Sequence, residues 1–188
     1  MIIDIFKTTV YKILINDLQF NKLILEELYN PKYKSFNRSN QGGKQIHPDK
    51  GTELELTLQK HLINYIPDYI AGLDYKNIFK GFIIDSFWIN ENKKHNYNHR
   101  HMHPDSHISG VYYCKVPKKS GRLFFEDIYS DHKNLCKGNL KAPLFETTHL
   151  ITPEERALLL FPSWLHHHVE PSETNEPRVS LSFNIRFF

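Results

Sequence analysis

The chain has 188 residues, of which 40% are hydrophobic and 13% aromatic, enough to bury a core as one domain spanning residues 1–188. Its 24 basic and 21 acidic residues leave a net charge of only +3 and form no long run of one sign, which argues against a nucleic-acid partner. Two cysteines make no disulfide framework, and no apolar run reaches the roughly 20 residues that span a bilayer. Because the N-terminal stretch also lacks the order of a signal peptide, we expect a soluble, cytoplasmic protein without a membrane partner.

The first 70 residues predict one strand and two helices. Short β-branched runs favour a strand over residues 2–15, and a helix over residues 17–30 is predicted to stop at Pro31. After a polar loop at 31–50, Thr52-Glu-Leu-Glu55 has the pattern of a capping box and begins a second helix, which we expect to end before Pro67. The predicted buried faces are Phe20, Leu23, Ile24 and Leu28 in the first helix, and Leu54, Leu58, Leu62 and Ile66 in the second.

Strands dominate the chain after residue 78. We expect them at residues 82–90, 101–103, 109–116, 122–126 and 158–161, around His167, and at 179–187. Residues 127–152 are predicted to form a long loop over the mouth of a barrel. Helices followed by strands indicate an α+β domain, with the helices packed outside a β sandwich or barrel.

The last predicted strand has an unusual polar face. Its residues alternate strictly between polar Arg178, Ser180, Ser182, Asn184 and Arg186 and apolar Val179, Leu181, Phe183, Ile185 and Phe187. A water-facing edge strand usually carries Lys, Glu and Thr, whereas Arg, Ser and Asn can bind a small carboxylate inside a barrel. Arg178 with Ser180 is the expected anion site, since a guanidinium binds a carboxylate in bidentate fashion and the hydroxyl adds a hydrogen bond. Arg186, further along, either joins this site or caps the end of the barrel.

Histidines form the second chemical signal. Eight of the twelve fall within residues 95–107 and 166–168. His101 and His103 stand at i and i+2, on one face of a strand, and His167 is the natural third ligand of a metal. The alternative second ligand is Asp105, from the pattern His103-Pro-Asp105. Nitrogen and oxygen ligands without thiolate suit iron, and they also accept zinc, nickel, copper or cobalt.

With these residues, the chain resembles the iron(II)- and 2-oxoglutarate-dependent oxygenases. The segments that carry the resemblance are Asn98-His-Arg-His-Met-His-Pro104, Ser109-Gly-Val-Tyr-Tyr113, Phe161-Pro-Ser-Trp-Leu-His-His167 and Arg178-Val-Ser-Leu-Ser-Phe-Asn184. The resemblance implies a double-stranded β-helix, the jelly roll shared with cupins, with the N-terminal helices packed outside.

The same resemblance implies the roles of the site residues. Fe(II) would be held by His101, His103 and His167, and the far carboxylate of 2-oxoglutarate by Arg178 and Ser180, with Tyr113 as a further hydrogen-bond donor. Trp88 and Asn90 would line the pocket. The implied reaction uses O2 to hydroxylate or otherwise oxidise a small-molecule or peptide substrate, with release of succinate and CO2.

One departure from the family pattern matters. His103 stands where the superfamily usually has Asp or Glu, so the third ligand is neutral and the iron site carries one more positive charge. This departure keeps open a three-histidine, cupin-type dioxygenase or other metalloenzyme that does not use 2-oxoglutarate. A non-catalytic jelly-roll binding module is the other alternative, and it predicts no metal-dependent turnover.

Overall fold

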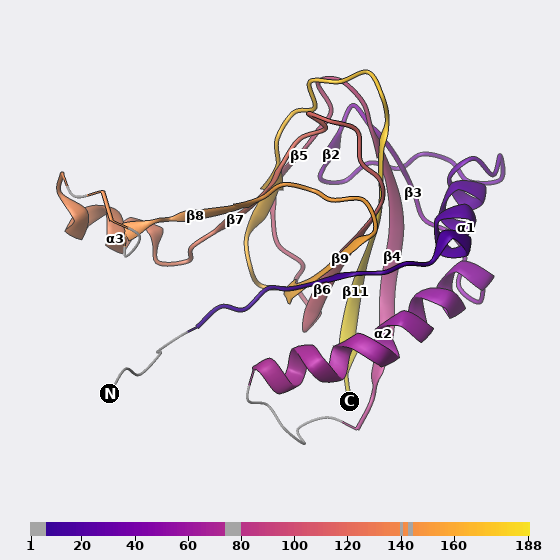
Figure 1. The fold of residues 1–188 in the computed structure, drawn as a ribbon, viewed down its shortest axis with the longest axis horizontal. Coiled ribbons are helices and arrows are strands. Elements are labelled where there is room, and N and C mark those ends of the chain that lie inside the picture. Colours follow the sequence, from indigo (N-terminus) through magenta and orange to yellow (C-terminus); the bar gives the residue numbers. More distant parts are fainter. Residues whose placement is uncertain (1–6, 74–79, 140, 143–144) are drawn as a thin grey trace.

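The computed structural model describes residues 7–73, 80–139, 141–142 and 145–188 (Figure 1). The helices are α1 (Leu18–Leu28), α2 (Glu53–Gly72) and α3 (Ser130–Lys137). The strands are β1 (Tyr11–Leu14), β2 (Asn40–Gln41), β3 (Lys44–Ile46), β4 (Phe82–Asn92), β5 (Tyr97–His101), β6 (Ile108–Lys115), β7 (Leu123–Glu126), β8 (Thr148–Ile151), β9 (Ala157–Pro162), β10 (His167–Val169) and β11 (Arg178–Phe187).

These strands form two facing antiparallel sheets. One has six strands in the order β1-β9-β6-β11-β4-β3, and the other has five in the order β2-β5-β10-β7-β8. From β4 to β11 the chain passes back and forth between the two sheets, with the pair β7 and β8 in the same sheet, as in a double-stranded β-helix. The expected α+β jelly-roll fold is therefore confirmed.

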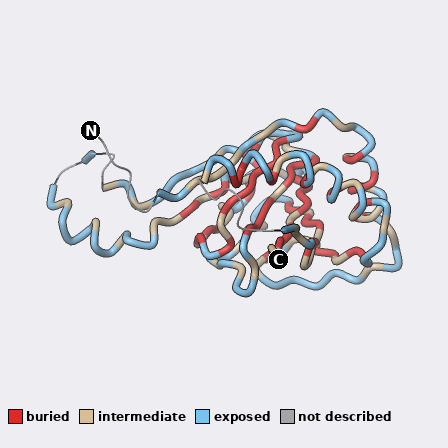
Figure 2. Tube along the Cα trace, turned by 90° about the horizontal axis from the view of Figure 1, so that it is seen from below, coloured by how far each residue is buried: buried red, intermediate tan, exposed pale blue. Residues whose placement is uncertain are grey.

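Helices α1 and α2 cover the outer face of the six-stranded sheet (Figure 1). The predicted apolar faces of both helices are buried, and they share one hydrophobic cluster with outward-facing residues of β4, β6, β9 and β11. A second cluster, which includes Tyr113, Leu123, Phe125 and Phe161, lies between the two sheets. Figure 2 shows the buried residues gathered in this body of the molecule.

Helix α2 is longer than predicted, because Pro67 does not end it. The helix begins at Thr52, whose side chain accepts a hydrogen bond from the Glu55 N–H as the capping pattern predicts, and it continues to Gly72. Pro67 lies on the exposed face, where water can satisfy the carbonyl that proline leaves without a partner. Tyr69 and Ile70, in the extra turn, are buried in the core, so packing outweighs the cost of the proline.

Several predicted boundaries need correction. The predicted strand at residues 2–15 is confined to Tyr11–Leu14, while residues 1–6 lie outside the described part of the chain. The polar loop at 31–50 contains the short strands β2 and β3, and the predicted long loop at 127–152 contains α3 and β8. In Figure 1, β7, β8 and α3 extend away from the body, and no described residue of α3 is buried.

Strand β11 has the two faces that its alternation predicts. Val179, Leu181, Phe183 and Ile185 are fully buried against the helices, whereas Arg178, Ser180 and Ser182 line a cavity between the sheets. The strand pairs along its length with β4 and with β6. Among the described residues, no helix is long and apolar enough to cross a membrane.

Candidate metal and anion site

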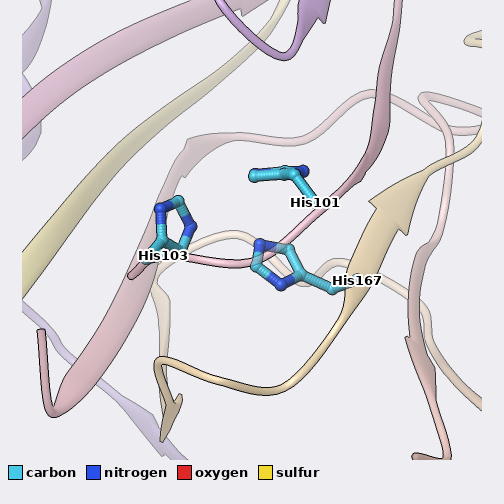
Figure 3. A group of neighbouring side chains, drawn as sticks. All are labelled: His101, His103 and His167. Atoms are coloured by element: carbon cyan, nitrogen blue, oxygen red, sulfur yellow. The ribbon is translucent and has the colours of Figure 1, made fainter. Parts of the chain in front are cut away.

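Three histidines meet at one point between the sheets (Figure 3). His101, His103 and His167 each offer one ring nitrogen, and these three nitrogens all lie within 4.8 Å of one another. His101, at the end of β5, stands directly opposite His167, at the start of β10, with ring centroids 4.3 Å apart. We call these three residues the histidine triad.

His103 is part of the triad, but it lies on a loop and not on the strand that the sequence pattern predicted. Strand β5 ends at His101, so His103 lies in the following loop and not on the strand expected at 101–103. Its backbone N–H donates to the Ser163 carbonyl, 2.9 Å away, which ties this loop to the loop before His167. The ring centroid of His103 lies 5.0 Å from that of His101 and 5.1 Å from that of His167.

Hydrogen bonds orient two of the three rings. The Nδ1 of His101 lies 2.6 Å from the His99 carbonyl, and the Nδ1 of His167 lies 2.8 Å from the Leu165 carbonyl. Because a carbonyl only accepts, each Nδ1 must carry the proton, which leaves each Nε2 with a free lone pair. Metal-binding histidines typically donate their second ring N–H to such a carbonyl.

The three imidazole rings of the triad are in the uncharged form that coordinates a metal cation. Burial is the main reason that the pKa of each imidazole lies below its usual value. The pKa falls to about 4 in His103, lies well below the usual value in His167, and is also lowered in His101. The three rings are therefore neutral at physiological pH. Neutral imidazole is the form that coordinates metal, so no proton has to be displaced.

Asp105, the alternative ligand, is not part of this group. It is exposed, has a left-handed backbone conformation (φ 66°), and does not belong to the cluster of potential ligands. His168, one position from His167, points to the other face of its strand, where its Nδ1 lies 3.0 Å from Glu126. The structure thus brings together the three predicted histidines and leaves Asp105 outside.

Arg178 lies in the same cavity as the triad. Its side chain is 2% exposed, and its Nη1 donates to the carbonyls of Ser120 (2.9 Å) and Gly121 (3.1 Å). Its Nε is buried without a hydrogen-bond partner, and no carboxylate of the described residues pairs with it. Burial lowers the pKa of this guanidinium, but arginine is basic enough to remain charged. A buried, unpaired guanidinium is stabilised by an anion.

Ser180 and Tyr113 flank this charge. They face each other in the pairing of β11 with β6, and both line the cavity. Tyr113 is 3% exposed, and burial raises its pKa to about 12, so its hydroxyl keeps the proton and can donate a hydrogen bond. Arg186, the second arginine considered, instead pairs with Asp85 at the surface.

Trp88 and Asn90 also line the cavity, as expected. The remaining wall residues are Ser39, Asn98, Gly110, Val111, Leu123, Phe161, Val169 and Ser182. Sequence analysis missed Ser39 and Asn98, which come from the β2 and β5 region and are joined by a hydrogen bond of 3.3 Å between their side chains. Asn98 opens the family-like motif at residues 98–104, but that motif was assigned to the site only through its histidines.

A larger cavity, of about 610 Å³, lies outside the triad. It is enclosed by β7, β8, α3 and the segment at Thr8 and Val10, and none of the three histidines lines it. Phe125 and Leu165 separate it from His167, whose ring lies 6.1 Å from that of Phe125. The three histidines and Arg178 therefore line only the smaller cavity.

Comparison with protein families decides the assignment. Residues 86–184, just over half of the chain, match the family model described as "Putative 2OG-Fe(II) oxygenase". The chain belongs to this family. The matched range contains the triad, Tyr113, Arg178 and Ser180, and the cofactors of the family, Fe(II) and 2-oxoglutarate, are those expected from the sequence. No curated protein matches the chain in sequence.

Solved structures of 2OG-Fe(II) oxygenases share the fold. A prolyl-4-hydroxylase from Pseudomonas putida is 16% identical (TM-score 0.64; 95% of this chain and 92% of that chain covered). The viral collagen prolyl hydroxylase of Paramecium bursaria Chlorella virus-1, in its 2OG complex, is 14% identical (TM-score 0.62; 95% and 96% covered). HygX from Streptomyces hygroscopicus, with nickel and 2-oxoglutarate bound, is 10% identical (TM-score 0.59; 95% and 83% covered). At these identities the likeness establishes the fold.

Proposed function

We propose that this protein is an Fe(II)- and 2-oxoglutarate-dependent oxygenase that hydroxylates a C–H bond of an organic substrate. The observation that carries the proposal is the presence, in one cavity, of three converging neutral imidazoles and a buried guanidinium without an anion. The first group fits a divalent metal and the second fits a carboxylate. A metal-bound dicarboxylate needs both.

The residues divide into two tasks. His101, His103 and His167 would hold Fe(II) on one side, which leaves its other positions open to ligands. Arg178 and Ser180, with the Tyr113 hydroxyl, would hold the far carboxylate of 2-oxoglutarate. When bound, these cofactors supply the oxidation: one oxygen atom of O2 enters the substrate C–H bond as a hydroxyl group, the other enters succinate, and 2-oxoglutarate loses its C1 carbon as CO2.

The protein contributes orientation and exclusion of water. The carbonyls of His99 and Leu165 hold two imidazole rings with Nε2 toward the shared point. The carbonyls of Ser120 and Gly121 hold the Arg178 side chain, and Phe161 and Leu123 contribute apolar surface to the cavity wall. In such an enclosed site, the charge of Arg178 acts at low dielectric and attracts a carboxylate more strongly than it would in water.

The deciding experiment is anaerobic addition of Fe(II) and 2-oxoglutarate, with detection of the weak visible charge-transfer band of the chelate. We expect the band in the wild-type protein and its loss in Arg178→Ala. Arg186→Ala is the matched control, because it removes an arginine from the same strand at a position paired with Asp85 outside the cavity. The control should retain the band.

Two other results would contradict the proposal. Stoichiometric Fe(II) binding without a band would favour a three-histidine metalloenzyme that does not use 2-oxoglutarate. Failure to bind Fe(II) would favour a binding module with the jelly-roll fold. A band in the wild-type protein justifies a substrate screen that measures succinate.

A further inference from the structure

An aromatic row leads from the triad to the surface. The Trp88 ring centroid lies 5.5 Å from that of His103 and 6.2 Å from that of His47, and the planes of Trp88 and His47 are inclined by only 26°. Phe36, which is 59% exposed, meets the His47 ring edge-on at 6.3 Å. Phe36, His47 and Trp88, called the aromatic row below, thus place flat apolar surfaces between the cavity and solvent.

A positive charge stands at the outer end of this row. The guanidinium carbon of Arg38 lies 5.8 Å from the Phe36 ring centroid. Burial lowers the pKa of His47, and the charge of Arg38 lowers it further. None of the ion pairs between described residues includes Arg38. Arg38 is therefore available to a negatively charged ligand.

The described side chains that line the cavity carry a net positive charge. No described Asp or Glu lines it, and Arg178 is its only permanently charged side chain. Nearby Glu126 is paired with Arg100, and Glu170 with Arg122. With Fe(II) and dianionic 2-oxoglutarate bound, the metal and cosubstrate cancel and the charge of Arg178 remains. A carboxylate in place of His103 would have cancelled it, so in this chain an anionic ligand beside the metal is favoured.

Asn90 adds a requirement for a hydrogen-bond donor. It is 5% exposed, lines the cavity, and its Oδ1 is buried without a partner among the described residues. Its Nδ2 already lies 3.4 Å from the Ser182 hydroxyl. Dianionic 2-oxoglutarate has no N–H or O–H group to offer, whereas an unpaired buried acceptor is costly. A second ligand with a donor group would satisfy it.

We infer that the substrate is a ring-bearing organic acid, with its ring on Trp88 and His47 and its acid group facing Arg38. An N–H or O–H group of the substrate donates to Asn90. This inference rests on the proposed function, because the ring then lies beside the metal ligand His103, where the oxidised C–H bond must be. Carboxylate and phosphate groups share the chemistry that Arg38 would recognise.

The test compares an acid with its uncharged counterpart. The wild-type protein is loaded anaerobically with Fe(II) and 2-oxoglutarate, the charge-transfer band is recorded, and 3-fluoro-4-hydroxyphenylacetate or its amide is titrated while fluorine NMR measures the dissociation constant. Both probes carry the ring and a phenolic donor, so they differ in charge. We expect the acid to bind roughly tenfold more tightly, as one charge-assisted hydrogen bond would give. The analogous phosphonate distinguishes a preference for phosphate from one for carboxylate.

Matched variants locate the effect. Arg38→Gln should reduce affinity for the acid to that for the amide, whereas Lys60→Gln, which removes an exposed charge on α2, should preserve the difference. His47→Ala should weaken both probes alike, because it removes ring contact and no permanent charge.

Three outcomes would overturn the inference while the proposed function stands: equal affinity for acid and amide, no binding of either probe, or equal effects of the Arg38 and Lys60 variants. Loss of the band on addition of the acid would overturn it too, since the acid would then be displacing 2-oxoglutarate at Arg178. A band that never forms with Fe(II) and 2-oxoglutarate instead rejects the proposed function itself.

Discussion

The backbone N–H of His103 donates to the carbonyl of Ser163, and the Ser163 side chain is anchored in a buried polar network. The Ser163 hydroxyl lies 2.8 Å from that of Ser109, which donates to Asn184 at 2.8 Å, and Asn184 donates to Ser86 at 3.2 Å. His103 is on a loop, so its position depends on this network more than on strand pairing. A backbone hydrogen bond thus joins the His103 loop to Ser163, and hydroxyl and amide groups join Ser163 to the six-stranded sheet.

Ser109→Ala should therefore loosen the triad. Removing the central hydroxyl leaves the Ser163 hydroxyl and the Asn184 Oδ1 without their partner in a buried region, which should cost about 1–3 kcal/mol of unfolding free energy. We expect Co(II) affinity, measured by calorimetry, to fall by roughly tenfold, at the lower end of the effects of altered ligand support. Ser120→Ala is the control, because the buried Ser120 hydroxyl has no partner among the described residues. Equal losses in both variants would contradict the role of the network.

The identity of the second metal ligand can be tested by a pair of substitutions. His103→Ala should lower Co(II) affinity by more than about 100-fold, since loss of a ligand's hydrogen-bond partner alone costs roughly 10- to 100-fold. Asp105→Asn should leave the affinity unchanged, and asparagine tolerates the positive φ at this position. The reverse pattern in calorimetric titrations would make Asp105 the ligand.

Gly121 should control affinity for 2-oxoglutarate. Its φ is +87°, and an added Cβ would lie 2.4 Å from the Glu170 carbonyl oxygen, so Gly121→Ala must move the loop whose carbonyls hold Arg178. We expect 2-oxoglutarate affinity, measured from the charge-transfer band, to fall by roughly tenfold, the equivalent of one lost hydrogen bond. Gly51→Ala is the matched control, because its φ is +80° but its Cβ would meet nothing within 4 Å.

The two glycine variants should also differ in stability. Gly51→Ala should lose about 1 kcal/mol of unfolding free energy from the left-handed backbone alone. Gly121→Ala should lose more, because the steric contact adds to the same backbone cost. Unchanged 2-oxoglutarate affinity in Gly121→Ala would show that the loop around Ser120 does not position Arg178.

Asp17 should make stability depend on pH. Its side chain accepts from the Phe20 N–H at the start of α1 (3.0 Å) and lies 3.0 Å from His61 of α2. Burial raises the pKa of this carboxyl, but the hydrogen bonds from Phe20 and His61 outweigh it and the net pKa is lowered. A lowered folded-state pKa means that the stabilisation is present above the unfolded value of about 3.9 and is lost as the pH falls through the folded value.

Two variants distinguish the contribution of the Asp17 helix cap to stability from the contribution of its charge. Asp17→Asn keeps an acceptor for the Phe20 N–H, so its deficit relative to the wild-type protein should be present at neutral pH. The deficit should shrink as the pH falls below about 3.9 and vanish below the folded-state pKa. Asp17→Ala should lose about 1 kcal/mol from the missing cap in addition. Urea denaturation across this pH range measures both, and a deficit of Asp17→Asn that does not change with pH would refute the charge contribution.

The sequence predicted the elements whose side-chain periodicity is local. The alternation of β11 and the apolar stripes of α1 and α2 were all found where expected, because each reflects burial of one face. The prediction that the second helix ends before Pro67 was wrong, because helix propensity does not indicate which face of a helix is exposed to water. The loop position of His103 was missed because an i, i+2 pair looks the same on a strand and on an extended loop held by Ser163.

Contacts between distant segments were beyond prediction. His47 and Phe36 lie in a polar stretch with no periodic pattern, and only the pairing of β3 with β4 brings His47 beside Trp88. The network of Ser109, Ser163 and Asn184 likewise joins three strands or loops separated by many residues. Family-like motifs indicated the three histidines that the structure brings together, whereas the groups that position them depend on tertiary structure.

The central place of β11 also has a consequence for how the protein is made. This strand lies between β4 and β6, and both of these precede it by many residues. Until β11 is synthesised, the sheet therefore consists of two separate halves, β1-β9-β6 and β4-β3. The edges of β6 and β4 that β11 will join are then unpaired. Such exposed edges favour association with other chains, and pairing over long sequence separations is slow. We therefore expect the nascent chain to be prone to association until β11 inserts, and the same insertion brings Arg178 to the cavity.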